Sequence, residues 1–163
     1  TPWFENWFDS PYYHILYKDR DYKEAENFIS NLINFLTPPE NSKILDLACG
    51  AGRHSIFINK MGYDVAGVDL SQNSIDTAKA HENENLHFDT HDMREVYNQN
   101  TFDYIFSMFT SFGYFENKAD NIKMLKSVNA GLKDNGTFVL DFFNSNIKIL
   151  NNKFKSYGNN KTI

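Results

Sequence analysis

The stretch Ile44-Leu-Asp-Leu-Ala-Cys-Gly-Ala-Gly-Arg-His54 decides the fold class of this chain of 163 residues. Its apolar start, followed by the two glycines Gly50 and Gly52, is typical of a strand that turns into a helix. Glycine tolerates positive φ and carries no side chain, so backbone amides in such a loop can approach a ligand closely. The amino end of the following helix favours negative charge. The stretch therefore predicts a ligand-binding turn after a buried strand.

Strands and helices are expected to alternate along the rest of the chain. Helical spacing of apolar residues predicts a first helix over 20–36, which Pro38 and Pro39 end. Short apolar runs and capping residues place the other elements: strands at 43–48, 64–69, 86–92, 102–109 and 136–143, and helices at 53–61, after Ser71, and from 117 or 118 to 132. The last helix is expected to turn four apolar residues inward: Ile122, Leu125, Val128 and Leu132. The alternation predicts an α/β fold, a doubly wound Rossmann-like parallel sheet with helices on both faces.

Composition and charge exclude several classes of protein. The hydrophobic fraction of 41% and the aromatic fraction of 16% are those of a packed globular protein. A formal net charge of -5 argues against a broad nucleic-acid surface. No apolar run reaches the roughly 20 residues that span a bilayer, and no targeting segment is evident. The single cysteine, Cys49, rules out an internal disulfide and favours a cytoplasmic location.

Acidic residues near the ends of the predicted strands narrow the choice of ligand. A dinucleotide-binding loop has a third glycine where this chain has Ser55. Asp46 precedes the glycines, where a carboxylate would repel a pyrophosphate and hold an ammonium group. Asp69 ends the second strand and can accept hydrogen bonds from both hydroxyls of a ribose. After the third strand, Asp92 offers a carboxylate to an exocyclic amine, and Met93 offers an apolar side chain to an adenine face. Together these residues outline an adenosine joined to an amino-acid-like group.

Four segments resemble, in this order, the motifs of class I S-adenosylmethionine-dependent methyltransferases: Asp46–Gly52, Gly67–Ser71, Asp92-Met93 and Phe102–Phe109. The resemblance covers roughly residues 42–144. It implies S-adenosylmethionine as the cofactor and methyl transfer as the activity of a transferase. It also implies that the glycine loop and the end of the fourth strand meet the methionine moiety, that Asp69 meets the ribose, and that Asp92 and Met93 meet the adenine. The cofactor-binding residues expected in all are Tyr17, Arg20, Asp46, Ala48, Gly50, Gly52, Asp69, Leu70, Asp92, Met93 and Met108.

The chain has only three arginines, Arg20, Arg53 and Arg94, each near a predicted ligand-facing element. Only a guanidinium offers a bidentate fork to a carboxylate. Arg20, which follows Tyr17 at the start of the first helix, is the candidate for the carboxylate of the cofactor or of the substrate. A surface or capping salt bridge is the equal alternative for Arg20, and it is the expectation for Arg53 and Arg94.

Catalysis needs little side-chain chemistry in this class of reaction. Methyl transfer from a sulfonium is an in-line displacement that mainly requires alignment of the acceptor, the methyl group and the sulfur. No nucleophilic residue is required, so the catalytic residues stay unassigned. His14, Tyr114 and His54 are the candidates for a base that would deprotonate the acceptor. Aromatic residues at 3–17 and 109–115 are interpreted as core packing, as a lid over the sulfonium, or as both.

We expect neither a metal site nor a catalytic thiolate. His87 and His91 lie four residues apart, which would suit one face of a helix, but a strand separates them by about 13 Å. Cys49 has no basic partner evident in the sequence, so it is expected to pack or to contact the ligand through its backbone.

A small molecule is the expected methyl acceptor. The acidic chain, the aromatic segments and the absence of an Asn-Pro-Pro-Tyr-like motif after the fourth strand favour it over a nucleic acid. Two other functions stay open. One is a noncatalytic module that binds adenosylmethionine or adenosylhomocysteine, and the other, less favoured, is a nicotinamide-dependent reductase.

The whole chain, 1–163, is expected to form one methyltransferase domain with three parts. These are a lid and helix at 1–41, a cofactor-binding core at 42–144, and a polar, loosely packed tail at 145–163. Members of the family continue past the fifth strand with a helix and an antiparallel hairpin, which so short a tail would lack. Either the family's C-terminal part is missing from the given residues, or the fifth strand is an exposed edge open to self-association. We also expect a chain that binds cofactor but is catalytically impaired or incomplete.

Overall fold

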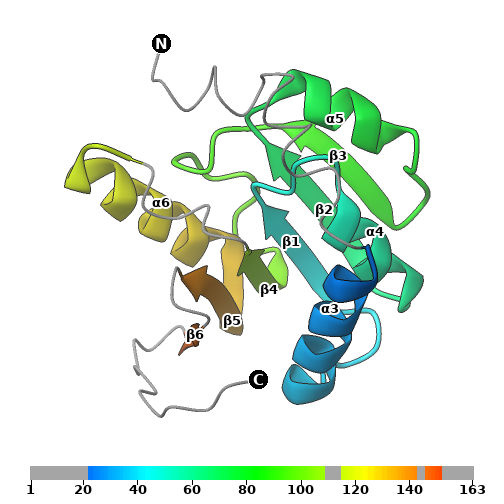
Figure 1. The fold of residues 1–163 in the computed structure, drawn as a ribbon. Helices are drawn as coiled ribbons and strands as arrows, with labels where there is room; N and C mark the ends of the chain where they lie inside the picture. The colour runs from blue at the N-terminus through cyan, green and yellow to red at the C-terminus, as the bar shows by residue number, and fades with distance from the viewer. Residues whose placement is uncertain (1–21, 109–114, 143–145, 152–163) are drawn as a thin grey trace.

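The computed structural model describes residues 22–108, 115–142 and 146–151 (Figure 1). In chain order the elements are α3 (Tyr22–Leu36), β1 (Lys43–Leu47), α4 (Arg53–Lys60), β2 (Asp64–Asp69), α5 (Gln72–Lys79), β3 (Leu86–Thr90), β4 (Phe102–Ser107), α6 (Lys118–Gly131), β5 (Leu132–Phe142) and β6 (Asn146–Asn151). Every helix and strand predicted from the sequence is present, with its ends shifted by a few residues. The largest shift is at β5, where residues 133–136 interrupt the pairing with β4 and the strand still extends back to Leu132.

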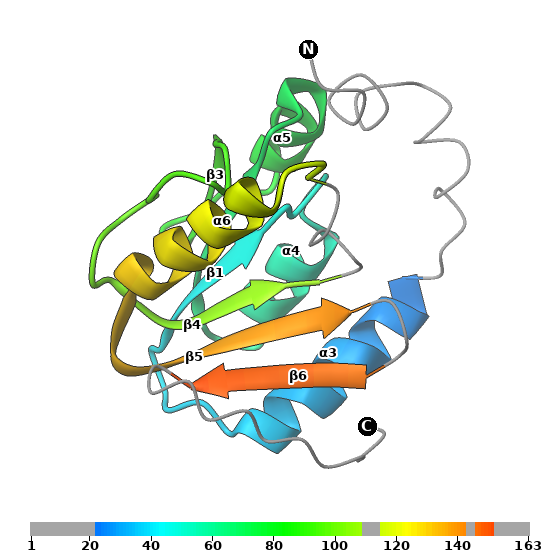
Figure 2. The same ribbon diagram turned by 90° about the vertical axis from the view of Figure 1, so that its left-hand side faces the viewer.

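The strands form one six-stranded sheet in the order β3-β2-β1-β4-β5-β6. Neighbouring strands are parallel from β3 to β5, and β6 runs antiparallel to β5 (Figure 2). The chain adds strands outward from β1 to β3, then returns to the other side of β1 to form β4. The predicted doubly wound parallel sheet is confirmed. Ligands bind such sheets at the carboxyl ends of the strands, beside the point where the strand order reverses, which here lies between β1 and β4.

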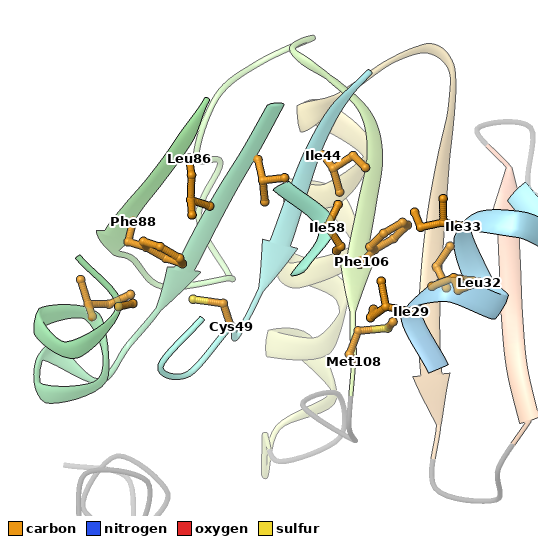
Figure 3. Close-up of a cluster of buried hydrophobic side chains, with 14 residues drawn as sticks. Ile29, Leu32, Ile33, Ile44, Cys49, Ile58, Leu86, Phe88, Phe106 and Met108 are labelled. Atoms are coloured by element: carbon orange, nitrogen blue, oxygen red, sulfur yellow. The ribbon is translucent and has the colours of Figure 1, made fainter. Parts of the chain in front are cut away.

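Helices cover both faces of the sheet. One face carries α3, α4 and α5, and the other carries α6 (Figures 1 and 2). Successive residues of β1 and β4 therefore both find a core: Ile44 faces the first cluster and Leu45 the second. Figure 3 shows the first cluster, in which Ile29 of α3 and Phe88 of β3 lie at opposite ends. Among the described helices, none is long and apolar enough to cross a membrane.

Two helices begin at the predicted capping residues. The backbone amide of Ser74 donates to the hydroxyl of Ser71 at 3.2 Å at the start of α5. The amide of Ala119 donates to the side-chain oxygen of Asn117 at 2.8 Å at the start of α6. Each cap satisfies a backbone donor that the first turn of a helix leaves without an intrahelical acceptor.

The inward face of α6 agrees with the prediction at Val128 and Leu132, which are buried, and at Leu125, which is partly buried, but it differs at Ile122. Ile122 is 54% exposed, whereas the buried residues of the helix are Met124, Ser127, Val128 and Gly131. The buried positions of α6 include a serine and a glycine because the helix lies close to the sheet. A Cβ on Gly131 would lie 3.3 Å from the Ile105 side chain, and the Ser127 hydroxyl donates to the carbonyl of Met93 at 2.6 Å. Hydropathy alone places Ile122 inward and misses this close approach.

The segment expected to be a loose tail contributes a strand. β6 pairs with β5 from Phe142↔Asn146 to Thr137↔Asn151. The expectation that β5 is an exposed edge is therefore wrong, and self-association through that edge loses its basis. Residues 146–151 read Asn-Ile-Lys-Ile-Leu-Asn, and their polar residues concealed a short run of β-branched and apolar residues that suits an edge strand.

Candidate cofactor site

The loop between β1 and α4 contains three residues with positive φ. Ala48 has φ 58°, Gly50 has φ 57° and Gly52 has φ 81°. A side chain in this left-handed region costs about 1–2 kcal/mol, so Ala48 is a strained position within the loop. A Cβ on Gly50 would meet nothing within 4 Å, whereas a Cβ on Gly52 would lie 2.6 Å from the Phe88 ring. Gly50 borders open space, and Gly52 is required by core packing.

The amides of the loop glycines bind within the protein. The Gly50 amide donates to a carboxylate oxygen of Asp69 at 2.8 Å, and the Gly52 amide donates to the carbonyl of Cys49 at 3.0 Å. The predicted contact of the glycine loop with the methionine moiety stays a prediction. Their hydrogen bonds shape the loop and tie it to the end of β2.

Asp46 lies beneath the loop, on the face covered by α4. It is 1% exposed, and one of its carboxylate oxygens accepts a hydrogen bond from the Ser55 hydroxyl at 2.6 Å. Burial raises the pKa of Asp46 to about 7, opposed by the Ser55 hydrogen bond and reinforced by the negative charge of Asp69. A Cβ on Gly67 of β2 would lie 2.9 Å from the Ser55 oxygen. Asp46 is thus enclosed by neighbouring strands and helix, and its predicted contact with an ammonium group remains a prediction.

Asp69 joins the two loops at the centre of the carboxyl edge. One of its oxygens accepts from the Gly50 amide at 2.8 Å, and the other accepts from the Ser71 amide at 2.9 Å. Leu70, the next residue, is 39% exposed. The two backbone amides fix the orientation of the Asp69 carboxylate beside this exposed apolar side chain, and the predicted contact of Asp69 with a ribose stays a prediction.

Asp92 forms a bidentate ion pair with Arg94 in the loop after β3. The Arg94 Nε lies 3.0 Å from both carboxylate oxygens, and one terminal nitrogen lies 2.5 Å from the Asp92 Oδ2. Burial raises the pKa of Asp92, but the hydrogen bonds and positive charge of Arg94 lower it more, so the pKa lies below its usual value. The expected salt bridge of Arg94 is confirmed, and it engages the carboxylate that was predicted to meet the adenine amine.

Two methionine side chains that were predicted to contact the cofactor are turned toward the core. Met93 is half-buried and packs against the second cluster, and Met108 is 3% exposed within the first cluster. Figure 3 shows Met108 beside Ile29 of α3. The predicted residues Tyr17 and Arg20 lie outside the described part of the chain, so the structure does not test their roles.

The candidate bases have two different outcomes. His14 and Tyr114 lie outside the described residues. His54 is 7% exposed, and burial, with a smaller contribution from the charge of Arg53, lowers its pKa to about 3. A buried imidazole with so low a pKa is a poor proton acceptor near neutral pH. Burial and the low pKa of His54 disfavour it as the general base.

The Cys49 thiol is a weak nucleophile, in line with the sequence interpretation. It is buried, and burial, together with the negative charges of Asp46 and Asp69, raises the pKa of its thiol well above the usual value. The residue participates in the loop through its backbone, since its amide donates to the carbonyl of Val68 at 3.0 Å.

Sequence reasoning missed three participants in the site. Ser55, Asp120 and Ser127 bond to Asp46, to Arg94 and to the backbone of Met93, respectively. Ser55 had a signal, because it stands where a dinucleotide-binding loop has glycine and follows Asp46 within one strand, loop and helical turn. Asp120 and Ser127 lie on a helix distant in sequence, and their contacts depend on how α6 packs.

A doubly wound sheet with acidic side chains at consecutive strand ends and a turn of positive φ residues between them defines a protein that binds an adenosine-type cofactor. Asp69 and Asp92 are the accessible carboxylates near these strand ends, and their contacts with the cofactor stay predictions.

Comparisons with known proteins identify the family. A family model described as a methyltransferase domain matches residues 44–136. The Bacillus subtilis (strain 168) protein YqeM, provisionally named a methyltransferase, is 36% identical over 110 residues, which cover 66% of this chain and 44% of that protein. The dTDP-3-amino-3,4,6-trideoxy-alpha-D-glucopyranose N,N-dimethyltransferase of Streptomyces venezuelae is 30% identical over 132 residues, which cover 79% of this chain and 54% of that enzyme. The solved structure of an S-adenosylmethionine-dependent methyltransferase from Clostridium acetobutylicum ATCC 824 has a TM-score of 0.66 and 26% identity, covering 84% of this chain and 56% of that one.

The chain therefore belongs to the methyltransferase-domain family, as a class I S-adenosylmethionine-dependent methyltransferase. S-adenosylmethionine is the cofactor of this class. The chain spans about half the length of the curated relatives that it matches.

Proposed function

We propose that this chain binds S-adenosylmethionine at the carboxyl edge of the sheet and transfers its methyl group to a small-molecule acceptor. The observation that carries the proposal is the Asp69 carboxylate, which two backbone amides hold between the β1 and β2 loops. A carboxylate fixed in this way can accept both ribose hydroxyls at once, and little conformational freedom is lost when they bind.

The residues around Asp69 fit the remaining parts of the cofactor. Open space beside Gly50 leaves room for the methionine moiety. The exposed side chain of Leu70 offers apolar surface beside the ribose. Asp92, whose side chain is 25% exposed, offers its outward lone pairs to the adenine amine.

Bound S-adenosylmethionine supplies an activated methyl group on a sulfonium, which the acceptor displaces in line. The protein's contribution in this proposal is to hold and align the two reactants. Among the described residues, neither Cys49 nor His54 supplies a reactive group, since the thiol is held protonated and the imidazole is buried and weakly basic. The proposal therefore needs no covalent intermediate with the protein.

A small-molecule acceptor, such as an amine, is supported by two independent points. The net charge of -5 disfavours the many phosphate contacts that a nucleic-acid substrate needs. The Streptomyces venezuelae relative is named for N,N-dimethylation of a nucleotide-linked amino sugar. The proposal places the acceptor's nitrogen or oxygen opposite the cofactor's methyl group.

A ligand panel tests this function. Thermal shift and calorimetry with S-adenosylmethionine, S-adenosylhomocysteine and NADH are expected to show stabilisation by the first two ligands only. Stabilisation by NADH alone would overturn the proposal in favour of a nicotinamide-dependent reductase. Methyl transfer to a panel of small amines and alcohols then separates an enzyme from a noncatalytic binding module, because the module would bind the cofactor and give no methylated product.

A further inference from the structure

Arg94 lies at the centre of a network that connects the loop after β3 with α6. Its Nε and one terminal nitrogen hold Asp92, and its other terminal nitrogen lies 3.3 Å from a carboxylate oxygen of Asp120 in the first turn of α6. The guanidinium carbon lies 5.3 Å from the centroid of the Phe115 ring. The planar group is therefore held by two carboxylates and one ring, and its rotation is restricted on every side that the structure describes.

The arrangement fixes the Asp92 carboxylate as well as the arginine. Arg94 Nε bonds both Asp92 oxygens, and the Arg94 backbone amide donates to the Asp92 Oδ1 at 2.9 Å. These donors approach from the arginine side, so the lone pairs on the opposite side keep one orientation. Nearby, the Ser127 hydroxyl holds the carbonyl of Met93 at 2.6 Å and fixes the same loop to the middle of α6.

We propose that Arg94 is a positioning residue for cofactor recognition, which orients the Asp92 carboxylate so that it selects the amine of adenine. The inference rests on the proposed binding of S-adenosylmethionine and adds a specificity-determining residue to that site. Arg94 itself does not touch the cofactor in this proposal, since its donors are directed to Asp92 and Asp120.

A purely structural salt bridge would predict a different outcome. Both members of the Asp92–Arg94 pair are 25% exposed at the side chain, and ion pairs that remain in contact with solvent add little to stability on their own. An ionised carboxylate accepts a hydrogen bond from an amine, whereas it repels a carbonyl oxygen in the same place. Arg94 is thus expected to affect which base binds more than whether the protein folds.

The charge of Asp92 provides a second readout. Without Arg94, burial is the largest remaining effect on Asp92, so its pKa should be higher than in the parent protein. As the pH falls, an Arg94 variant should therefore protonate Asp92 and lose the acceptor earlier than the parent protein. The other charged groups facing this pair are His91, Asp120 and, beside Asp120, Lys123.

Two ligands that differ only in the base provide the experiment. S-adenosylhomocysteine carries an exocyclic amine, and S-inosylhomocysteine carries a carbonyl oxygen in its place. Calorimetry with the chain is expected to show at least about tenfold tighter binding of the adenosyl ligand, because a hydrogen bond to a charged acceptor replaces a repulsion. In Arg94→Met the preference is expected to fall below about threefold and to decrease further between about pH 7.5 and about pH 5.

Two further variants keep the test independent of folding. Arg94→Lys keeps a positive charge but lacks the planar fork, so an intermediate preference is expected even if Arg94→Met does not fold. Lys133→Met is the control. It removes the cation of the Lys133–Asp103 ion pair at the amino end of β4, away from the Asp92 loop, and it should keep the parent preference within about twofold.

The outcomes separate the inference from the function on which it rests. If neither ligand binds the parent chain, the proposed function fails. If the parent prefers the adenosyl ligand and either Arg94→Met or Arg94→Lys keeps the full preference at both pH values, the role of Arg94 is overturned. Loss of preference in the Arg94 variants, with retention in Lys133→Met, supports it.

Discussion

Asp46 and Asp92 are both acidic residues near the carboxyl end of a parallel strand, yet their pKa values are shifted in opposite directions. Asp46 is 1% exposed and meets a neutral hydroxyl. Burial raises its pKa to about 7. The Asp92 side chain is 25% exposed and meets a guanidinium, which holds its pKa below the usual value despite burial. The partner and the depth of burial decide the charge of each carboxylate, and its place in a motif does not.

This contrast divides the site into a floor and a rim. The floor is the buried set beneath the glycine loop: Asp46, Gly52, Ser55, Gly67 and Phe88. The rim is the accessible set along the carboxyl edge: Gly50, Asp69, Leu70 and Asp92. Changes in the floor should alter stability, and changes in the rim should alter cofactor affinity.

The largest expected effect comes from the floor. Gly52→Ala adds a Cβ that would lie 2.6 Å from the Phe88 ring, at φ +81°. Overpacking and left-handed strain together should lower the free energy of unfolding by about 3 kcal/mol. Gly50→Ala is the matched control, since its Cβ meets nothing within 4 Å, and only strain of about 1 kcal/mol is expected. Equal losses in urea denaturation would remove the distinction between the two glycines.

The next effect comes from the centre of the rim. Asp69→Ala should weaken binding of S-adenosylhomocysteine by about 1–3 kcal/mol, because charge-assisted hydrogen bonds to the ribose are lost. Calorimetry measures the change. Asp76→Ala, on the exposed face of α5 where Asp76 bonds to Gln72, is the matched acidic control and should bind like the parent. Unchanged affinity in Asp69→Ala would remove Asp69 from the site.

The pH dependence of stability tests the raised pKa of Asp46. A carboxyl whose pKa is about 7 when folded and near 4 when unfolded binds more protons in the folded state between these values. Stability should therefore rise by about 1 kcal/mol as the pH falls from about 8 to about 6. Asp46→Asn should abolish this increment while it keeps an acceptor for Ser55. If the variant and the parent show the same dependence in denaturation, Asp46 is not its source.

The smallest expected effect tests backbone strain at Ala48, in the loop that lies between the floor and the rim. Ala48 has φ 58°, so Ala48→Gly should raise the free energy of unfolding by about 0.5 kcal/mol, the relief of strain less the greater entropy of unfolded glycine. Ala51→Gly, at an exposed position of the same loop outside the positive-φ set, should instead destabilise by a few tenths of a kcal/mol. Chemical denaturation of both variants against the parent measures the difference in sign.

The fold could be predicted from the sequence because each central strand is buried on both faces. Runs such as Lys43–Leu47 and Phe102–Ser107 are then nearly continuous in apolar residues, and Ser71 and Asn117 mark helix starts through short local hydrogen bonds. These signals are local, and the strand order follows from the alternation of strand and helix.

The parts that could not be predicted depend on contacts distant in sequence. Asp46 shares its face of β1 with Ile44, so strand parity could have placed it inward, but its enclosure depends on Ser55 and Gly67. The bond from Arg94 to Asp120 requires α6 to pack at one depth and rotation. Hydropathy does not encode that rotation, which is also why Ile122 was placed on the wrong side.

The buried position of Cys49 makes its thiol a probe for opening of the glycine loop. Its thiol is the only one in the sequence, and it is buried at the junction of the glycine loop with the first cluster. A thiol reagent can reach it only when this loop separates from the core. The rate of alkylation therefore measures how often the loop opens, without any added label, and a ligand that closes the site should slow the reaction in proportion to its occupancy.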